Sequence, residues 1–461
     1  MKVSFVIGVA LCFFIAPIVA MADPIEAHSV SKKNYDASMD SFLQRYFSPN
    51  KPGAAILVMK NGELLLNRAY GLASVELSAP VKPDTVFHIA SVGKQFTAAA
   101  ILRLSEKGLL DINAPIGKYL ADLPDSWRAI TVENLLTHTS GIGNLWNDPE
   151  FRTRARNDLT PQQLIAIAIS KPLLHAPGTA HTYATVNYTV LGQIITQVSG
   201  KNYDAFLREE FFQPLGMNHT TFDQENKIVE GLATPYVAGP APAPFMSKMH
   251  GFAGGSYYSN THDVAIWQTS LLSGKVVLLA NLKKLTTAYR LIDGTDSHYG
   301  FGLRIHTMDG QPYLQSNGDI PGFHSEVVSI PSANILVAIL TNGEEISSGL
   351  DPIAKRLAAI ALDKPIPDLN GVKLPRRSIN ALLGTYVAGE HKIVIKTIDG
   401  RLFSENPGNP PDPISAISPT EFFFDGNQDA RLRFTVKNGK AVGVLPYTVD
   451  RTSAPYFKHV D

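Results

Sequence analysis

The stretch FHIASVGKQFT, residues 87–97, decides how this chain is interpreted. It places Ser91 and Lys94 three residues apart, just before an apolar run with helical spacing that extends to Gly108. Side chains three apart share one face of a helix, so the serine hydroxyl can pass its proton to a neutral lysine amine. Backbone N–H groups at a helix N-terminus would stabilise the charge that develops on attack. The stretch therefore predicts a nucleophilic serine with an adjacent base.

The Ser-x-x-Lys spacing is not specific by itself, because it also occurs at Ser29–Lys32 and Ser48–Lys51. The first of these lies in a polar leader, and the second contains Pro49-Asn50, which favours a turn. Only Ser91 precedes a long apolar helix, so we take Ser91 as the nucleophile.

The N-terminus has the pattern of a secretory signal. Lys2 is followed by an apolar run, Val3–Val19, and by the small residues Ala20-Met21-Ala22. We expect residues 1–22 to be removed and the protein to be exported, either periplasmic or secreted. An uncleaved membrane anchor is the alternative, but the apolar run is short for a membrane span and contains Pro17.

Composition excludes several classes of partner. The 461 residues include 41 Lys and Arg and 41 Asp and Glu, so no net field attracts nucleic acid or anionic lipid. The 13 histidines are dispersed without the spacing of metal ligands, so we expect neither a metal nor a cofactor. The partner that remains is a small-molecule or short-peptide substrate.

Residues 23–365 mix helices and strands. They predict an α+β domain, an antiparallel sheet with helices packed on it plus a helical subdomain. The apolar run Gly53–Met59, the turn Asn61-Gly62 and the return Glu63–Ala69 predict a hairpin. Further helices are expected at Phe96–Leu110, Pro161–Ser170, Tyr188–Val198 and His262–Leu272, and further strands at Phe323–Ile330 and Ile335–Thr341.

The C-terminal part of the chain has a different pattern. A linker at residues 366–375 cannot continue a helix, because prolines flank and interrupt it. Residues 376–461 then alternate short strands with Asp-Gly and Asn-Gly turns, which predicts a small all-β barrel or sandwich. Leu432, Phe434 and Val436 alternate with polar residues, as one buried face requires. We expect this domain to cover one rim of the cleft or to mediate self-association.

An ordered series of motifs between about residues 40 and 345 points to a family. The motifs are Pro52-Gly53-Ala54-Ala55, Tyr70-Gly71, Thr85-Val86-Phe87, Ser91-x-x-Lys94, Leu135–Gly141, Pro177-Gly178-Thr179, Tyr183, Asn187-Tyr188, Leu191-Gly192, Ala253-Gly254-Gly255, Asp263, Trp267, Ser316-Asn317-Gly318, Pro321-Gly322-Phe323, Pro331 and Leu340-Thr341-Asn342. This order resembles the class C β-lactamase-related, penicillin-binding-protein-like family of serine hydrolases. The resemblance implies a β-lactamase/transpeptidase-like fold.

The resemblance also implies roles for individual residues. Ser91 would be the acylated nucleophile, Lys94 its base, and Tyr183 the phenol that relays a proton to or from the leaving group. Backbone N–H groups of Ser91 and Asp319 would form the oxyanion hole. The positions implied to bind substrate are Thr185, Ser316, Asn317 and Gly318.

Two of these positions depart from the family pattern. Thr185 stands where the family usually has asparagine, and a hydroxyl cannot donate and accept in the same places as an amide. Ser316 stands where the family usually has lysine or histidine, a cation that would pair with a substrate carboxylate. We therefore expect weak or absent β-lactam hydrolysis, and better turnover of uncharged esters or of amides recognised through an amine.

Three other side chains each allow two interpretations. His138 is expected to be a packed, hydrogen-bonded turn histidine rather than a catalytic one. His324 could reach the cleft from its strand or point away from it. Trp146 could line the mouth of the pocket or simply pack there.

The sequence thus predicts a serine hydrolase that forms an acyl-enzyme at Ser91, either an esterase or a peptidase/amidase. The alternative is a catalytically impaired binding or scaffolding protein that has kept the fold. The intact set of Ser91, Lys94 and Tyr183 favours the enzyme.

Overall fold

The computed structural model describes residues 35–222, 228–238, 241–344, 349–366, 368–407, 411–425, 427–448 and 455–460. The predicted signal at residues 1–22 lies outside the described residues. Among the described residues, no helix combines the length and apolar character that a membrane crossing needs.

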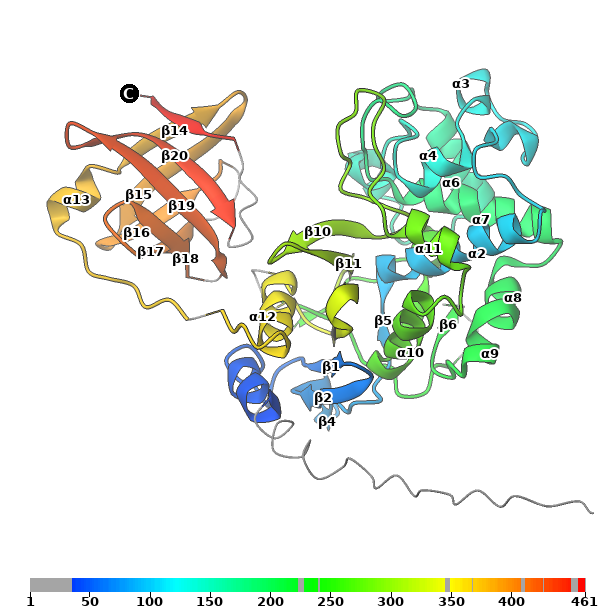
Figure 1. Ribbon diagram of the computed structural model, residues 1–461, viewed down its shortest axis with the longest axis horizontal. Helices are drawn as coiled ribbons and strands as arrows, with labels where there is room; N and C mark the ends of the chain where they lie inside the picture. Colours follow the sequence, from blue (N-terminus) through cyan, green and yellow to red (C-terminus); the bar gives the residue numbers. More distant parts are fainter. Residues whose placement is uncertain are drawn as a thin grey trace, which may run out of the picture.

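A six-stranded antiparallel sheet forms the centre of the larger domain (Figure 1). Its strands in spatial order are β10 (Arg304–Met308), β11 (Gln311–Ile320), β12 (Phe323–Ile330), β13 (Ile335–Thr341), β1 (Ala54–Lys60) and β2 (Glu63–Tyr70). The predicted hairpin is confirmed as β1 and β2. Its turn has φ 54° at Asn61 and 82° at Gly62, the left-handed pair that a two-residue hairpin turn requires.

Helices cover both faces of this sheet. In β1, Ala55 and Leu57 join one apolar core while Ile56 and Val58 join the other, because successive side chains point to opposite faces. One face packs on α12 (Asp351–Ala361) and on helical residues 35–43. The other packs on α10 (Thr261–Leu272) and on a helical subdomain that contains α2 (Lys94–Glu106) and α7 (Thr185–Ser199).

The predicted helices are present with shifted ends. Helix α2 starts at Lys94 rather than Phe96, and it ends before Gly108, whose φ is 70°. The helix predicted to start at Tyr188 starts at Thr185. The prediction placed the start too late because the first turn lacks the apolar periodicity of the rest of the helix. The remaining helices are α3 (Asp125–Arg128), α4 (Val132–Leu136), α5 (Pro149–Arg152), α6 (Pro161–Ile169), α8 (Tyr203–Leu207), α9 (Gln213–Leu215), α11 (Leu279–Leu285) and α13 (Arg376–Asn380). The short strands are β3 (Leu72–Ser74), β4 (Ala79–Pro80), β5 (Phe87–His88), β6 (Thr221–Phe222), β7 (Tyr236–Val237), β8 (Ala241–Pro242) and β9 (Tyr257–Ser259).

The C-terminal domain is a closed antiparallel barrel of eight strands. They are β14 (Gly384–Ala388), β15 (His391–Ile398), β16 (Arg401–Glu405), β17 (Asp412–Ala416), β18 (Glu421–Phe424), β19 (Asn427–Lys437), β20 (Lys440–Thr448) and β21 (Phe457–Val460). Leu432 and Phe434 point into its core, as predicted. The prediction for Val436 is wrong: this side chain is 38% exposed, because the register of β19 shifts between Thr435 and Val436.

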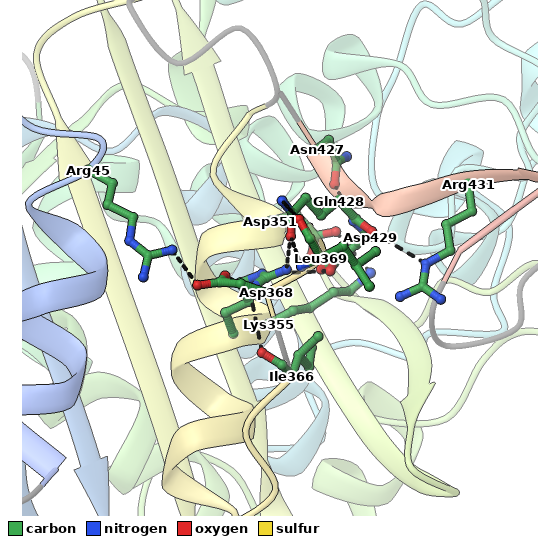
Figure 2. A network of polar contacts seen from close by, with 11 residues as sticks. Arg45, Asp351, Lys355, Ile366, Asp368, Leu369, Asn427, Gln428, Asp429 and Arg431 are labelled. Carbon is green, nitrogen blue, oxygen red and sulfur yellow. Dashed lines mark hydrogen bonds and ion pairs between the residues drawn. The ribbon is translucent and has the colours of Figure 1, made fainter. Parts of the chain in front are cut away.

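An extended segment after α12 leads to the barrel, which lies beside the sheet domain (Figure 1). Figure 2 shows Asp368 of this segment close to Gln428 and Asp429 at the start of β19. The buried Arg356 of α12 joins them, since its guanidinium donates to Asp368 Oδ1 at 2.8 Å and to Gln428 Oε1 at 3.2 Å. One side chain therefore links the larger domain, the connecting segment and the barrel.

Candidate active site

Ser91 lies in a single 3₁₀ turn, Ala90–Gly93, that runs directly into α2. Ala90 has a φ of 44°, in the left-handed region that residues with a side chain rarely adopt. Gly255 packs so closely that an added Cβ would lie 2.9 Å from the carbonyl carbon of Ala90. Close packing thus holds a strained turn, a feature that is concentrated at functional sites.

Two side chains converge on the Ser91 hydroxyl. Lys94 is 1% exposed, and its Nζ lies 2.9 Å from Ser91 Oγ. The same nitrogen donates to the Gly254 carbonyl at 2.6 Å, which fixes its direction. The Tyr183 hydroxyl donates to Ser91 Oγ at 2.9 Å, and Lys94 Nζ lies 4.9 Å from the centre of the Tyr183 ring. The structure therefore brings together the three residues that were predicted from the sequence to be catalytic.

His138 supports the segment that carries Tyr183. Its Nδ1 accepts hydrogen bonds from the Ala184 backbone at 3.3 Å and from the Asn187 amide at 3.1 Å, and its ring centre lies 4.4 Å from that of Tyr183. Burial, reinforced by the charge of Lys94, holds the pKa of His138 well below its usual value. His138 is thus a neutral acceptor in a turn with φ 56°, packed and hydrogen-bonded as predicted.

Strand β11 lies against the Ser91 turn at Gly318. An added Cβ on Gly318 would come within 2.3 Å of the Ile89 carbonyl oxygen and 2.8 Å of Ser91 N, so this close approach requires glycine. Asp319 follows on β11 and lines the same cavity as Ser91. The oxyanion hole from the N–H groups of Ser91 and Asp319 stays a prediction that this approach makes geometrically reasonable.

A cavity of about 670 Å³ opens above Ser91. Among the predicted substrate-binding residues, Thr185 and Asn317 line it. Ser316 is 4% exposed and shares with Gly318 the face of β11 that packs on the Ser91 turn. Ser316 and Gly318 are therefore not among the residues that line this cavity.

The other walls of this cavity are largely apolar. Trp146 lines it together with Phe245 and Phe323, so Trp146 lies at the pocket. His324 points away from it, and its Nδ1 lies 2.7 Å from Asp319 Oδ1 on the opposite face of the sheet. The sequence left open whether Trp146 and His324 lie at the cleft; in the structure Trp146 lines the cavity and His324 does not.

Arg304, the first residue of β10, is a candidate that sequence analysis missed. It lines the Ser91 cavity, and its guanidinium carbon lies 5.9 Å from the centre of the Tyr183 ring. Position 316 carries no cation, but the neighbouring strand brings one to the cleft, because Arg304 pairs with Gln315 of β11. No local pattern around Arg304 distinguishes it from a surface arginine, so only the strand pairing could have found it.

The geometry agrees with a match between the sequence and a known family. The profile described as Beta-lactamase matches residues 34–361. The chain belongs to the Beta-lactamase family. The nucleophile, its neighbouring lysine and the tyrosine all fall within the matched region.

Similar proteins include homologues of penicillin-binding proteins and an amidase. PbpX of Bacillus subtilis (strain 168), which carries the name of a penicillin-binding protein, is 29% identical over 301 residues, 63% of this chain and 68% of that protein. The octameric penicillin-binding protein homologue of Pyrococcus abyssi has a TM-score of 0.66 and 24% identity, covering 91% of this chain and 99% of the other. The D-amino acid amidase of Ochrobactrum anthropi SV3, solved with L-phenylalanine amide, has a TM-score of 0.62 and 22% identity, covering 72% and 99%. The similarity in structure establishes the fold of the family.

Proposed function

We propose that this chain hydrolyses an amide or ester bond through an acyl-enzyme at Ser91. One observation carries the proposal: Ser91 Oγ lies 2.9 Å from both Lys94 Nζ and the Tyr183 hydroxyl. A base and a proton relay on one hydroxyl are what serine acylation requires.

The steps follow from these contacts. Neutral Lys94 takes the proton of Ser91 as Oγ bonds to the substrate carbonyl carbon, and the carbonyl oxygen becomes an oxyanion facing the N–H groups of Ser91 and Asp319. The bond to the leaving group then breaks, and the proton passes from Lys94 through Tyr183 to the departing oxygen or nitrogen. Water attacks the acyl-enzyme by the reverse route, giving up a proton to the same pair and releasing Ser91.

The lining of the cavity suits a substrate with an apolar group on one side of the scissile bond and a leaving group that carries a carboxylate on the other. Trp146, Phe245 and Phe323 offer apolar walls for an apolar group. Tyr183 would protonate the leaving group, and Arg304 lies against its ring, so a carboxylate on the leaving group would pair with Arg304. The similarity to a D-amino acid amidase makes small amino-acid amides reasonable first substrates.

We propose weak or absent β-lactam hydrolysis. Arg304 weakens the charge argument made from Ser316, because it brings a cation to the cleft. One feature still supports the proposal: Thr185, which lines the cavity, replaces the usual amide.

A panel of substrates tests the function. kcat/KM would be measured for a p-nitrophenyl ester, D- and L-phenylalanine anilides and a chromogenic cephalosporin. We expect turnover of the ester or an anilide, abolished in Ser91→Ala and retained in Ser48→Ala, which alters the exposed serine of another Ser-x-x-Lys match. A cephalosporin rate well above the others contradicts the proposed substrate class, and no turnover or acylation of any substrate favours the binding-protein alternative.

Two properties outside the site are also proposed. Export follows from the signal pattern at residues 1–22 and is tested by fractionation with N-terminal sequencing of the mature chain. Self-association is supported by the octameric state of the Pyrococcus abyssi homologue, and we propose the barrel as the contact. Light scattering of the full chain and of a chain ending near residue 370 tests it, since loss of the oligomer on truncation would support the barrel as the contact.

A further inference from the structure

A second cavity, of about 580 Å³, lies beside the first. It occupies the face of β11 and β12 covered by α12, opposite the face that packs on the Ser91 turn. Arg304, Asn317 and Asp319 line both cavities, so the two share a wall formed by the ends of β10 and β11.

Carboxyl groups dominate this second cavity, which we call the acidic cavity. Its lining includes Asp319, Glu326, Glu344 and Asp351, and Arg304 is the single lysine or arginine among the described lining residues. Two of these carboxyl groups have a partner nearby, since Lys355 Nζ lies 3.0 Å from Asp351 Oδ2 and His324 Nδ1 lies 2.7 Å from Asp319 Oδ1. The charge of Lys355 also acts on Glu326, but burial has the larger effect on the pKa of that carboxyl.

Two buried side-chain atoms of residues that line this cavity lack a hydrogen-bond partner among the described residues. Glu326 is 3% exposed, and its Oε1 is unpartnered. The Nε2 of His324 is also unpartnered, and its Nδ1 lies 2.7 Å from Asp319 Oδ1. The two residues are two apart on β12 and therefore point to the same face.

Leaving the buried Glu326 Oε1 without a hydrogen bond is costly in a folded protein, and a ligand that donates a hydrogen bond to it would remove that cost. Burial, with the nearby charge of Asp351, raises the pKa of Glu326 well above its usual value. A bound cation would reverse this effect by stabilising the carboxylate. Because no group of three or more metal-binding side chains occurs in the described part of the chain, an organic cation fits better than a metal ion.

We infer that the acidic cavity binds a primary ammonium group on the leaving-group part of the substrate. The inference rests on the proposed function, in which Tyr183 delivers a proton to the leaving group. The Arg304 guanidinium carbon lies 5.9 Å from the centre of the Tyr183 ring, and Arg304 and Glu326 both line the acidic cavity, so a leaving group held at Arg304 would extend toward Glu326. The substrate class is thus an amide whose leaving amino acid pairs its carboxylate with Arg304 and its side-chain amine with Glu326.

A matched substrate pair tests this inference with the full chain. N-acetyl dipeptides ending in lysine or in norleucine differ by the ammonium group on a side chain of the same four-carbon length, and both D and L forms would be used. We expect kcat/KM to be about ten- to a hundredfold higher for the lysine peptide, the value of one charge-assisted contact. Glu326→Gln should bring the ratio toward one, whereas Glu63→Gln, an exposed carboxyl on β2, should leave the ratio unchanged. A wild-type ratio near one overturns the inference.

A binding measurement separates this inference from the proposed function. Calorimetry on Ser91→Ala compares the two peptides without turnover, and at least tenfold tighter binding of the lysine peptide supports the acidic cavity. Equal affinity overturns it, even if Glu326→Gln fails to fold. If instead wild type neither hydrolyses any peptide nor reacts at Ser91, the proposed function fails, and the difference in affinity still decides whether the cavity binds an ammonium group.

Discussion

Gly318→Ala is predicted to inactivate the enzyme while leaving it folded. The new Cβ would lie 2.3 Å from the Ile89 carbonyl oxygen, 2.6 Å from Ser325 Oγ and 2.8 Å from Ser91 N. Ordinary contact begins at 3.4 Å, so β11 must retreat from Ile89 by about 1 Å, a displacement of catalytic groups that can cost about 10²-fold in rate. Loss of an oxyanion-hole donor by itself costs about 10²–10³-fold in kcat.

The assay is kcat/KM for a p-nitrophenyl ester, together with thermal unfolding. We expect Gly318→Ala to lose at least about 10²-fold in kcat/KM with a folded transition still visible. Gly62→Ala is the control, because Gly62 has a φ of 82° and nothing within 4 Å of an added Cβ. It should lose about 1–2 kcal/mol of stability through backbone strain and keep its activity. Normal activity in Gly318→Ala would refute the close approach of β11 to Ser91.

Three further predictions follow from other contacts. Tyr183→Phe should lower kcat about 10²–10⁴-fold if the phenol moves the proton, and an unchanged kcat would reduce Tyr183 to a packing role. Burial lowers the pKa of His88 to about 3, against about 6.5 in the unfolded chain, so the free energy of unfolding should decrease as the pH drops from 6.5, by about 2 kcal/mol at pH 5. Denaturant unfolding at pH 7.5 and pH 5 should show a smaller loss of stability in His88→Gln than in wild type. An equal loss in the two proteins would argue against a neutral His88. Arg356→Ala strips the cation from the buried Asp429 carboxylate, 3.8 Å away, and should destabilise the chain by about 3–5 kcal/mol; an unchanged unfolding temperature would contradict the joining role of Arg356.

The fold was largely predictable, because its signals are local. The β1–β2 hairpin follows from an Asn-Gly turn between apolar runs, and α2 follows from helical periodicity that ends at Gly108. Strand detail was less predictable, since a one-residue bulge after Thr435 turns Val436 outward and nothing in the alternation announces it. The start of α7 at Thr185 was missed for a related reason, because a first helical turn need not be apolar.

The site was predictable only where it depends on neighbours in sequence or on a motif. Ser91 and Lys94 are three residues apart, so helical geometry brings them together, whereas Tyr183 entered through its motif. Arg304 lies near Tyr183 because β10 pairs with β11, and the Asp309-Gly310 turn between these strands is the local signal that could have revealed the pairing. The sequence around Glu326 predicts only that it lies in a strand, and its burial beside a cavity is known only from the structure.

Covalent labelling of Ser91 tests the central claim most directly. Wild type, Lys94→Ala and Ser91→Ala would be treated with a fluorophosphonate and examined by intact mass, with the modified peptide mapped. We predict one adduct per chain at Ser91 in wild type, labelling slowed by orders of magnitude in Lys94→Ala because the hydroxyl loses the base 2.9 Å away, and no adduct at this peptide in Ser91→Ala. An adduct on another serine, or equal labelling of wild type and Lys94→Ala, would contradict the account.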